Sequence, residues 1–260
     1  MRACKGTVTL IFAIGDIHGQ ITMLRALLDK LNRLPLRNND TLVFIGDYVD
    51  RGEDSRAVIE ALIELKTQRP DTVFLRGNHE QLMLDARDSA PPEIGGLPGA
   101  FMLSEEMLLW LSNGGEETML SYSSEMEETD FLKWWEIVPE SHWEFIQQTR
   151  MEYISGRYQF VHAGLLPEGA YWEGADRNFD PRLWIREPFL SSTHDFGGRI
   201  IVFGHTPQNS GHPLLRKNKY GIDTGAVFGG RLTAVGIDPE SKPRRFPSPQ
   251  VVQVEHAVGN

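Results

Sequence analysis

Three apolar runs open the chain, and each is followed by a short polar segment and then by apolar residues at helical spacing. The runs are rich in β-branched and aromatic residues, which is typical of strands buried on both faces. We expect strands at residues 7–14, 41–45 and 73–75. We expect helices after them at residues 21–34, 57–66 and 80–87, with Ser55 as the N-cap of the second. The repeat of about thirty residues has the size of a βαβ unit, so the strands should be parallel with right-handed crossovers.

The middle of the chain changes to a helical pattern with methionine, leucine and tryptophan at mixed spacing. Residues 90–99 are rich in proline and glycine and should form a loop. Residues 101–150 should be helical, so we expect a helical insertion over the sheet at about residues 90–150. The pair Trp134-Trp135 either packs in the core or contacts a substrate, and the pattern leaves both alternatives open.

After residue 151 the apolar period shortens to that of strands. We expect a hairpin at residues 153–154 and 158–161, joined by Ser155-Gly156. Further short strands are expected at residues 199–203, 220–222 and 231–237, with a last edge strand at 251–254. Residues 242–249 are rich in proline and should be irregular, within a C-terminal tail of about residues 240–260. We expect the whole chain, residues 1–260, to form a single domain.

The composition is that of an ordinary globular protein. Of 260 residues, 40% are hydrophobic and 24% are charged, which is enough for a packed core. The formal net charge of −10 argues against nucleic acid and against a membrane surface as partners. An anionic substrate stays compatible with this charge, because bound metal ions can reverse it locally.

The cysteine content favours a reducing compartment. Cys4 is the only cysteine, so we expect a free, partly exposed thiol, no disulfide within the chain and no thiolate metal site. No run approaches the roughly 18 apolar residues of a membrane span. Residues 8–14 lead directly into the first polar segment, which is unlike a signal peptide. We therefore expect a cytoplasmic protein.

The candidate chemistry lies in the polar segments that follow the three strands. These segments read Gly15-Asp16-Ile17-His18-Gly19, Gly46-Asp47-Tyr48-Val49-Asp50-Arg51-Gly52 and Gly77-Asn78-His79-Glu80. In a parallel sheet they would meet at the carboxyl ends of the strands, where ligands bind. Carboxylate and amide oxygens together with imidazoles suit divalent metal ions in phosphoryl chemistry. The pattern therefore predicts a metal site at this end of the sheet.

The spacing indicates which side chains could share an ion. In an extended chain, Asp16 and His18 would project to the same side. Asp47 follows the next strand, about 5 Å away, and could bridge two ions about 3.5–4 Å apart. Asn78 follows the third strand and offers a neutral oxygen, and an extended segment would turn its neighbour His79 to the opposite side.

Histidines behind two later strands strengthen this interpretation. Phe160-Val161-His162-Ala163-Gly164 and Phe203-Gly204-His205-Thr206-Pro207 repeat the setting of the first and third motifs. One histidine in such a place is more often structural, but four of them together with two aspartates and an asparagine favour a metal centre. The four are His18, His79, His162 and His205. The others, which lack the setting and are expected in loops or at the surface, are His142, His194, His212 and His256.

The blocks GDIHG, GDYVDRG, GNHE, VHAG and GHT follow one another in an order that resembles the PPP-type metallophosphoesterases. This is the family of bacterial and eukaryotic Ser/Thr protein phosphatases, and the motifs cover about residues 15–230. Three segments resemble the bacterial branch: Trp110-Leu111-Ser112-Asn113-Gly114-Gly115, Leu183-Trp184-Ile185-Arg186-Glu187 and Ile222-Asp223-Thr224-Gly225. The resemblance implies an α/β fold, a calcineurin-like β-sandwich of two mixed sheets flanked by helices.

The same resemblance implies ligands for two divalent metal ions. Asp47 would bridge the two ions. Asp16 and His18 would complete the first site, and Asn78, His162 and His205 the second. Oxygen and nitrogen donors without sulfur suit manganese, iron or zinc, and the resemblance favours manganese, Mn2+.

The resemblance also implies catalytic roles for neighbouring residues. Asp50 would hydrogen-bond His79 and favour its imidazolium form, so that His79 protonates the leaving group. A water or hydroxide shared by the metal ions would attack phosphorus directly. Arg51 could grip two phosphate oxygens, and Arg186 would be the second clamp unless it forms a salt bridge with Glu187 or another carboxylate.

Three further residues have supporting roles in this interpretation. Arg76 and Glu80 flank the third motif and are expected to be structural or to support the ligands. Asp223 either orients a ligand or closes a turn, and both alternatives stay open.

Three hypotheses for function follow. The leading one is a metal-dependent phosphomonoesterase that acts on phosphoserine or phosphothreonine, or on phosphotyrosine, in proteins. The nearest alternative is a symmetrical bis(5′-nucleosyl)-tetraphosphatase or another small-molecule phosphoesterase, although such hydrolases often carry Gln where this chain has His18. The third is a non-catalytic phosphate-binding scaffold, which predicts a lost ligand, whereas every implied ligand is present.

Overall fold

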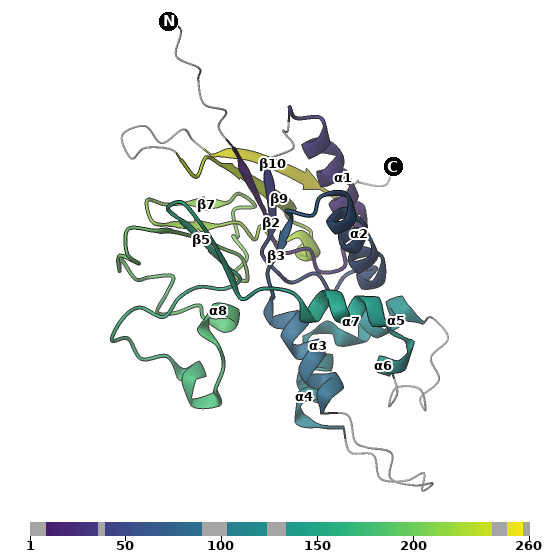
Figure 1. Ribbon diagram of the computed structural model, residues 1–260. Helices are drawn as coiled ribbons and strands as arrows, with labels where there is room; N and C mark the ends of the chain where they lie inside the picture. Colours follow the sequence, from purple (N-terminus) through teal and green to yellow (C-terminus); the bar gives the residue numbers. More distant parts are fainter. Residues whose placement is uncertain (1–8, 36–39, 90–102, 124–133, 241–248, 257–260) are drawn as a thin grey trace, which may run out of the picture.

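The first of two five-stranded sheets is built mainly from the N-terminal part of the chain. The computed structural model describes residues 9–35, 40–89, 103–123, 134–240 and 249–256 (Figure 1). The sheet has the order β10-β9-β1-β2-β3, with β1 (Ile11–Ile14), β2 (Thr41–Phe44), β3 (Val73–Phe74), β9 (Arg231–Ile237) and β10 (Gln250–Glu255). The pairs β1–β2 and β2–β3 are parallel, which confirms the prediction. The antiparallel strands β9 and β10 extend the sheet, and β10 is its predicted edge strand.

The second sheet contains the strands that follow the helical insertion. It has the order β4-β5-β6-β8-β7, with β4 (Glu152–Ser155), β5 (Tyr158–Val161), β6 (Ile200–Phe203), β7 (Leu214–Leu215) and β8 (Lys219–Gly221). The antiparallel pair β4–β5 is the predicted hairpin. Strands β5, β6 and β8 are parallel, and β7 is antiparallel to β8. Both sheets are therefore mixed, as the resemblance implied, and only the two-residue strand β7 was too short to be predicted.

Helices follow the first three strands and then form the insertion. The first three are α1 (Ile21–Asn32), α2 (Ser55–Gln68) and α3 (Asn78–Asp88). The insertion contains α4 (Glu105–Trp110), the kinked turn η1 (Leu111–Gly115), α5 (Glu116–Tyr122), α6 (Trp134–Ile137) and α7 (Glu140–Gln147). Figure 1 shows α1 and α2 beside the first sheet, with α4 packed against α3, and α5 and α7 against α2. The described part of residues 101–150 is thus helical, as the pattern predicted, while Cys4, the loop at 90–99 and most of the Pro-rich stretch at 242–249 lie outside the described residues.

Side chains that alternate between the two faces of β1 show how the two sheets and the helices pack in layers. Ile11 and Ala13 face the second sheet and pack in the same apolar cluster as Val202 of β6. Phe12 and Ile14 face the other way, into the cluster formed with the helices. A third cluster covers the outer face of the second sheet, with Val161, Ile201, Phe203, Ile185 and Phe189 among its members. Both faces of β1 are therefore buried, which is why its sequence is continuously apolar.

Two helix starts differ from the prediction. The N-cap of α2 is Asp54, whose carboxylate accepts a hydrogen bond from Ala57 N at 2.8 Å, and not Ser55. Ser55 lies one position later and its buried hydroxyl accepts from the backbone N–H of Asp50. Helix α3 begins at Asn78, so Asn78 and His79 occupy its first turn and not an extended segment. Their side chains diverge because successive helical residues are rotated by about 100°.

Two side chains of the insertion prove to be core residues. Trp134 is 1% exposed, and its ring lies 4.2 Å from that of Trp110 and 5.5 Å from that of Trp143. Of the two predicted alternatives, core packing is therefore confirmed for Trp134. Trp135 is partly buried and packs against the same cluster. His142 was expected in a loop or at the surface, but it lies in α7 and is 4% exposed, with Nδ1 2.8 Å from the Tyr122 hydroxyl.

No helix in the described parts of the chain is both long enough and apolar enough to cross a membrane.

Candidate active site

The polar motifs converge through unusual backbone conformations at the ends of the strands. Five of the six non-glycine residues with positive φ in the described structure belong to these motifs. They are His18 (φ 46°), Asp47 (55°), Asp50 (74°), Arg51 (67°) and His205 (60°). Such conformations are costly and persist where surrounding contacts impose them, which often occurs at functional sites.

Hydrogen bonds between the motifs supply these contacts. The backbone N–H groups of Ile17 and His18 both donate to Asp47 O, at 2.9 and 2.8 Å. The buried Glu80 carboxylate accepts from Asp47 N (2.9 Å), Tyr48 N (2.7 Å) and Gly77 N (2.8 Å). Glu80 therefore joins the second motif to the third, in agreement with the supporting role expected for it.

Arg76 supports the same motif from outside. Its guanidinium donates to Gln147 O at 2.8 Å and to Thr149 Oγ1 at 3.1 Å, so it links the start of α3 to the end of α7. It is a structural residue, as expected.

Asp47 lies at the centre of the converged side chains. Its Oδ2 is 3.4 Å from His18 Nε2, and its Oδ1 is 3.3 Å from His162 Nε2. Two buried groups can be drawn whose donor atoms all lie within 4.8 Å of one another: His18, Asp47 and His79, and Asp47, His162 and His205. One carboxylate is thus shared by two sets of potential metal ligands.

Asn78 completes the second group. Its Oδ1 lies 2.9 Å from His162 Nε2 and 2.9 Å from His205 Nδ1. Burial alone would lower the pKa of His162, but the carboxylates of Asp47 and Asp16 raise it to about 9. Burial and the neighbouring His162 instead hold the pKa of His205 well below its usual value. The distances place Asn78, His162 and His205 around one point beside Asp47.

A hydrogen bond at Nδ1 orients the imidazoles of His18 and His162. His18 Nδ1 is 2.9 Å from Val49 O, and His162 Nδ1 is 2.9 Å from Ile45 O. With each Nδ1 anchored to a backbone carbonyl, both Nε2 atoms are directed at Asp47. This is the arrangement in which histidine ligands of metals are held.

Asp16 stands outside the two groups but beside the second one. Its Oδ2 accepts from His205 N at 2.8 Å, while its buried Oδ1 has no hydrogen-bond partner, and neither has His205 Nε2. Burial and the Asp223 carboxylate raise the pKa of Asp16, and burial and Asp47 raise that of Asp223 to about 6. Buried oxygen and nitrogen atoms without hydrogen-bond partners, beside several buried carboxylates, are typical of residues that bind cations.

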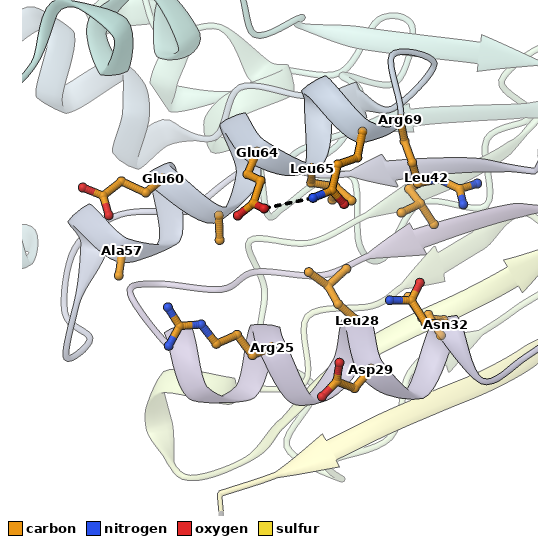
Figure 2. Close-up of a pocket in the computed structure, with 13 residues that line it drawn as sticks. Arg25, Leu28, Asp29, Asn32, Leu42, Ala57, Glu60, Glu64, Leu65 and Arg69 are labelled. Carbon is orange, nitrogen blue, oxygen red and sulfur yellow. Dashed lines mark hydrogen bonds between the residues drawn. The ribbon is translucent and has the colours of Figure 1, made fainter.

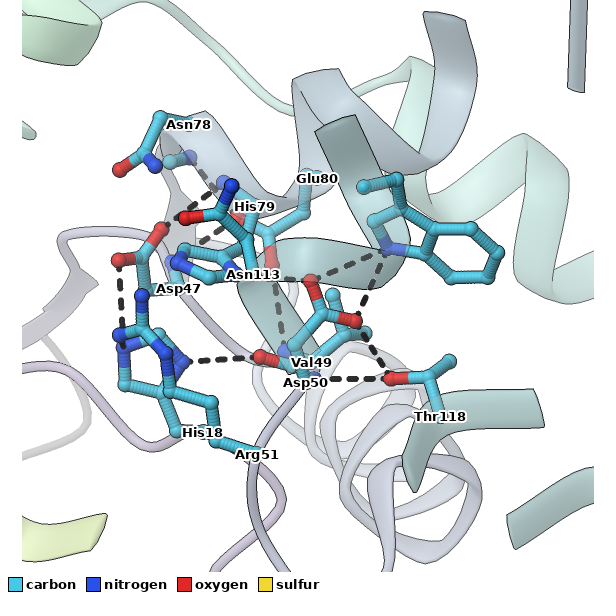
Figure 3. Close-up of polar contacts among 12 residues, drawn as sticks. His18, Asp47, Val49, Asp50, Arg51, Asn78, His79, Glu80, Asn113 and Thr118 are labelled. Carbon is cyan, nitrogen blue, oxygen red and sulfur yellow. Dashed lines mark hydrogen bonds and ion pairs between the residues drawn. The ribbon is translucent and has the colours of Figure 1, made fainter. Parts of the chain in front are cut away.

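The Asp50–His79 pair lies next to these donors (Figure 3). His79 Nδ1 is 2.7 Å from Asp50 Oδ2, and the His79 ring meets the His18 ring edge-on at 4.6 Å. Burial alone would lower the pKa of His79, but the carboxylates of Asp47 and Asp50 outweigh it and raise the pKa. His79 therefore differs from His18, whose pKa burial lowers to about 3.

Two residues of the insertion, which the sequence pattern did not assign to the site, form hydrogen bonds to the Asp50 carboxylate. Trp110 Nε1 is 3.1 Å from both Asp50 oxygens, and Thr118 Oγ1 donates to Asp50 Oδ1 at 2.7 Å (Figure 3). Thr118 also receives the backbone N–H of Asp50 at 2.8 Å. The signal for Trp110 was its place in a segment that resembles the bacterial branch, but Thr118 carried none.

Both arginines lie beside the donor cluster. Arg51 is half-buried, with Nη1 3.1 Å from His18 Nε2, and its backbone N–H donates to Gly114 O of η1 at 3.1 Å. Arg186 is exposed and its Nη2 lies 3.4 Å from His205 O. Among the described residues no ion pair joins Arg186 to Glu187, whose carboxylate accepts from Ser191. Each arginine is therefore placed next to one histidine of the cluster.

Asp223 closes a turn, which was one of its two predicted alternatives. Its Oδ1 accepts from Gly225 N at 2.9 Å. Its charge nevertheless contributes to the centre, since it raises the pKa of Asp16.

Two pockets lie outside the donor cluster. One, of about 370 Å³, lies between α1 and α2 and contains none of the predicted site residues (Figure 2). The other, of about 1040 Å³, lies between α3, α4 and α8 (Pro181–Trp184). Trp184 lines this groove, and its ring lies 6.3 Å from that of His205. The groove therefore reaches the edge of the site.

Comparison with known proteins agrees with this geometry. The model of the calcineurin-like phosphoesterase family matches residues 9–230. Serine/threonine-protein phosphatase 1 of Salmonella typhimurium is 30% identical over 87% of this chain and 91% of its own length. An asymmetrical bis(5′-nucleosyl)-tetraphosphatase of Anoxybacillus flavithermus is 28% identical over 93% and 92%. A solved structure provisionally assigned as a diadenosine tetraphosphatase has a TM-score of 0.54 and 20% identity, over 98% of this chain and 97% of that one. The chain belongs to the calcineurin-like phosphoesterase family.

Proposed function

We propose that this chain is a two-metal phosphomonoesterase that hydrolyses phosphoserine and phosphothreonine, and also phosphotyrosine, in proteins. The observation that carries the proposal is Asp47, whose two carboxylate oxygens face imidazoles of two different buried donor groups. A carboxylate in this position is suited to bridging two ions. The ions neutralise phosphoryl charge and provide water of lowered pKa when they are bound.

We assign the ligands as the sequence predicted them. Asp16, His18 and Asp47 serve the first ion, and Asp47, Asn78, His162 and His205 serve the second. The unpaired Asp16 Oδ1 and His205 Nε2, and the backbone carbonyls that orient His18 and His162, support the assignment. Manganese is the metal we propose: the three oxygen-donating and three imidazole side chains include no sulfur, which suits manganese, iron or zinc, and the family resemblance favours manganese.

We assign His79 as the general acid. A carbonyl partner leaves His18 neutral and able to bind a cation, whereas the carboxylate partner of His79 favours imidazolium. With Nδ1–H donated to Asp50, the second N–H of His79 is free to protonate the leaving oxygen.

Arg51 and Arg186 are our proposed phosphate clamps. Their guanidinium groups lie beside His18 and His205, from which they can contact phosphate oxygens presented to the donor cluster.

The groove between α3, α4 and α8 supports a peptide substrate. Its walls include Asp85, Asp88, Glu105, Glu106 and Asp180, which outnumber the basic residues Arg177 and Arg182. The mutual repulsion of this acidic wall contributes to the raised pKa of Asp85, after burial. A tetraphosphate chain would be repelled by it, whereas a peptide with basic side chains would be attracted.

The second candidate is an asymmetrical dinucleoside tetraphosphatase, which the 28% identical relative favours. The resemblance of the sequence motifs points to the symmetrical enzymes, whereas this relative is asymmetrical. Parallel kinetics on a phosphoserine peptide and on diadenosine tetraphosphate separate the candidates. We expect kcat/KM to favour the peptide by at least about a hundredfold, and the opposite preference would overturn our choice.

The proposed chemistry is tested with Asp16→Asn and His79→Asn. We expect Asp16→Asn to lose hydrolysis of p-nitrophenyl phosphate, and His79→Asn to lose hydrolysis of a phosphoserine peptide, by at least about a hundredfold. Metal analysis should show fewer than two ions per chain in Asp16→Asn and an unchanged content in His79→Asn. His212→Asn, at an exposed histidine, is the control. Unchanged turnover in both variants would refute the mechanism.

A further inference from the structure

Phe228 is an exposed aromatic residue at the edge of the candidate active site. It ends η4 (Ala226–Phe228), and 66% of it is exposed. The centre of its ring lies 5.7 Å from the guanidinium carbon of Arg51. Arg51 in turn contacts His18 Nε2. Going outward from the donor cluster, the Arg51 guanidinium therefore comes first and the Phe228 ring second.

The turn that carries Phe228 is held by its own hydrogen bonds. Phe228 N and Gly230 N both donate to Gly225 O, at 2.9 and 2.8 Å, and Gly225 N donates to the buried Asp223 carboxylate. Gly225 (φ 73°) and Gly229 (φ 80°) adopt the left-handed conformations that the turn requires. The ring is consequently presented to solvent from a fixed backbone, which reduces the entropy that a contact with a ligand would cost.

We propose that Phe228 is a specificity-determining residue that stacks on a planar aromatic group next to the substrate phosphate. The inference rests on the proposed function, because it places that phosphate at Arg51. Aromatic pairs prefer ring centres about 4.5–7 Å apart. The proposal requires an aromatic group carried next to a phosphate at Arg51 to lie within this range of Phe228. Single exposed apolar side chains are common, but this one adjoins the phosphate clamp.

Two sources can supply the aromatic group. One is the tyrosine ring of a phosphotyrosine peptide, and the other is the base of a nucleotide. The phosphoserine residue of a matched peptide has no such ring and serves as the internal reference.

The test compares kcat/KM of the wild-type protein, Phe228→Leu and Phe228→Ala on three substrates. These are phosphotyrosine and phosphoserine peptides of identical flanking sequence, and diadenosine tetraphosphate. We expect both variants to lose about three- to tenfold on the phosphotyrosine peptide and less than about twofold on the phosphoserine peptide. Expressing each value relative to wild type removes the difference in leaving-group reactivity.

The variants also separate stacking from shielding of Arg51. Leucine covers the guanidinium but cannot stack, so equal losses on both peptides, or a Phe228→Leu protein that behaves as wild type, overturn the inference. A selective loss on diadenosine tetraphosphate alone assigns the ring to a base. Tyr171→Ala, at an aromatic residue that is 73% exposed and bonded to Asp176, should leave all ratios unchanged.

Failure of the inference is distinguishable from failure of the proposed function. A wild-type protein that hydrolyses none of the three substrates overturns both. A wild-type protein that hydrolyses them with ratios insensitive to Phe228 overturns only the inference.

Discussion

At the scale of single residues, the site depends on side chains that each satisfy two partners. Asp50 shows this most clearly, because it accepts from His79 and is held by Trp110 and Thr118. Removing the charge of Asp50 should therefore change the proton on His79 without disturbing the metal donors.

Asp50→Asn tests this role. An amide cannot favour the imidazolium as a carboxylate does, so protonation of the leaving oxygen should weaken. We expect kcat on a phosphoserine peptide to fall about 10²–10⁴-fold. We expect a much smaller loss on p-nitrophenyl phosphate, whose leaving group needs little protonation. Equal losses on both substrates would contradict a general-acid role, and Asp29→Asn on α1 is the control.

Gly204 shows how closely the donors are packed. A Cβ atom at this position would lie 2.0 Å from Asp16 Oδ1. We expect Gly204→Ala to displace the Asp16 carboxylate and to lower the bound metal below two ions per chain, as measured by elemental analysis. Gly198→Ala, where a Cβ would meet no atom within 4 Å, should keep the full metal content. Full occupancy in Gly204→Ala would show that Asp16 is not a ligand.

At the scale of elements, the helical insertion acts on the site through α4, η1 and α5. Trp110 ends α4 and Thr118 lies in α5, and both hold Asp50, while the η1 carbonyl of Gly114 accepts the Arg51 N–H. The insertion therefore orients the proposed acid and the phosphate clamp in addition to covering the core.

Trp110→Phe separates orientation from packing. Phenylalanine keeps most of the apolar contact but removes the N–H shared by the Asp50 oxygens. We expect kcat to fall about ten- to a hundredfold, corresponding to a lost charge-assisted hydrogen bond, with unchanged metal content. Trp143→Phe, which alters the same aromatic cluster away from Asp50, should keep kcat within about twofold. A larger effect of Trp143→Phe would indicate that packing is responsible.

At the scale of the whole molecule, burial of ionisable groups links stability to pH. His142 is buried with the Tyr122 hydroxyl at Nδ1, and burial lowers its pKa below the ordinary value near 6.5. As the pH falls through about 6.5, the unfolded chain takes up a proton that the folded chain resists. This residue therefore makes the free energy of unfolding decrease toward acidic pH.

His142→Gln should reduce that dependence. Urea unfolding at pH 7 and pH 5 is expected to give a smaller decrease in the variant, by up to about 1.4 kcal/mol per pH unit. His212→Gln, at an exposed histidine, should retain the wild-type decrease. An identical decrease in His142→Gln and wild type would show that His142 is not the group responsible.

Sequence pattern alone was enough to place the strands of the first sheet, their parallel order and the polar motifs at their carboxyl ends. Buried parallel strands need continuous apolar runs, and the chemistry of such sheets is confined to one end. The resemblance added the two mixed sheets and the convergence of His162 and His205 on Asp47. Local pattern was misleading for Ser55, whose hydroxyl bonds to Asp50 N and to Thr118 of the insertion, and for His142, which is buried against Tyr122 of α5.

What only the tertiary structure decided is how the motifs are held and presented. The left-handed backbone of His18 and Asp47, and the helical position of His79, replace the extended segments assumed from spacing. The contacts of Asp50 with Trp110 and Thr118 cross 60 and 68 positions of sequence. Periodicity records which side of an element is buried, whereas a hydrogen bond between distant motifs depends on how those elements pack. The sequence therefore determined which donors this chain carries, and the packing determined which atoms of those donors face one another.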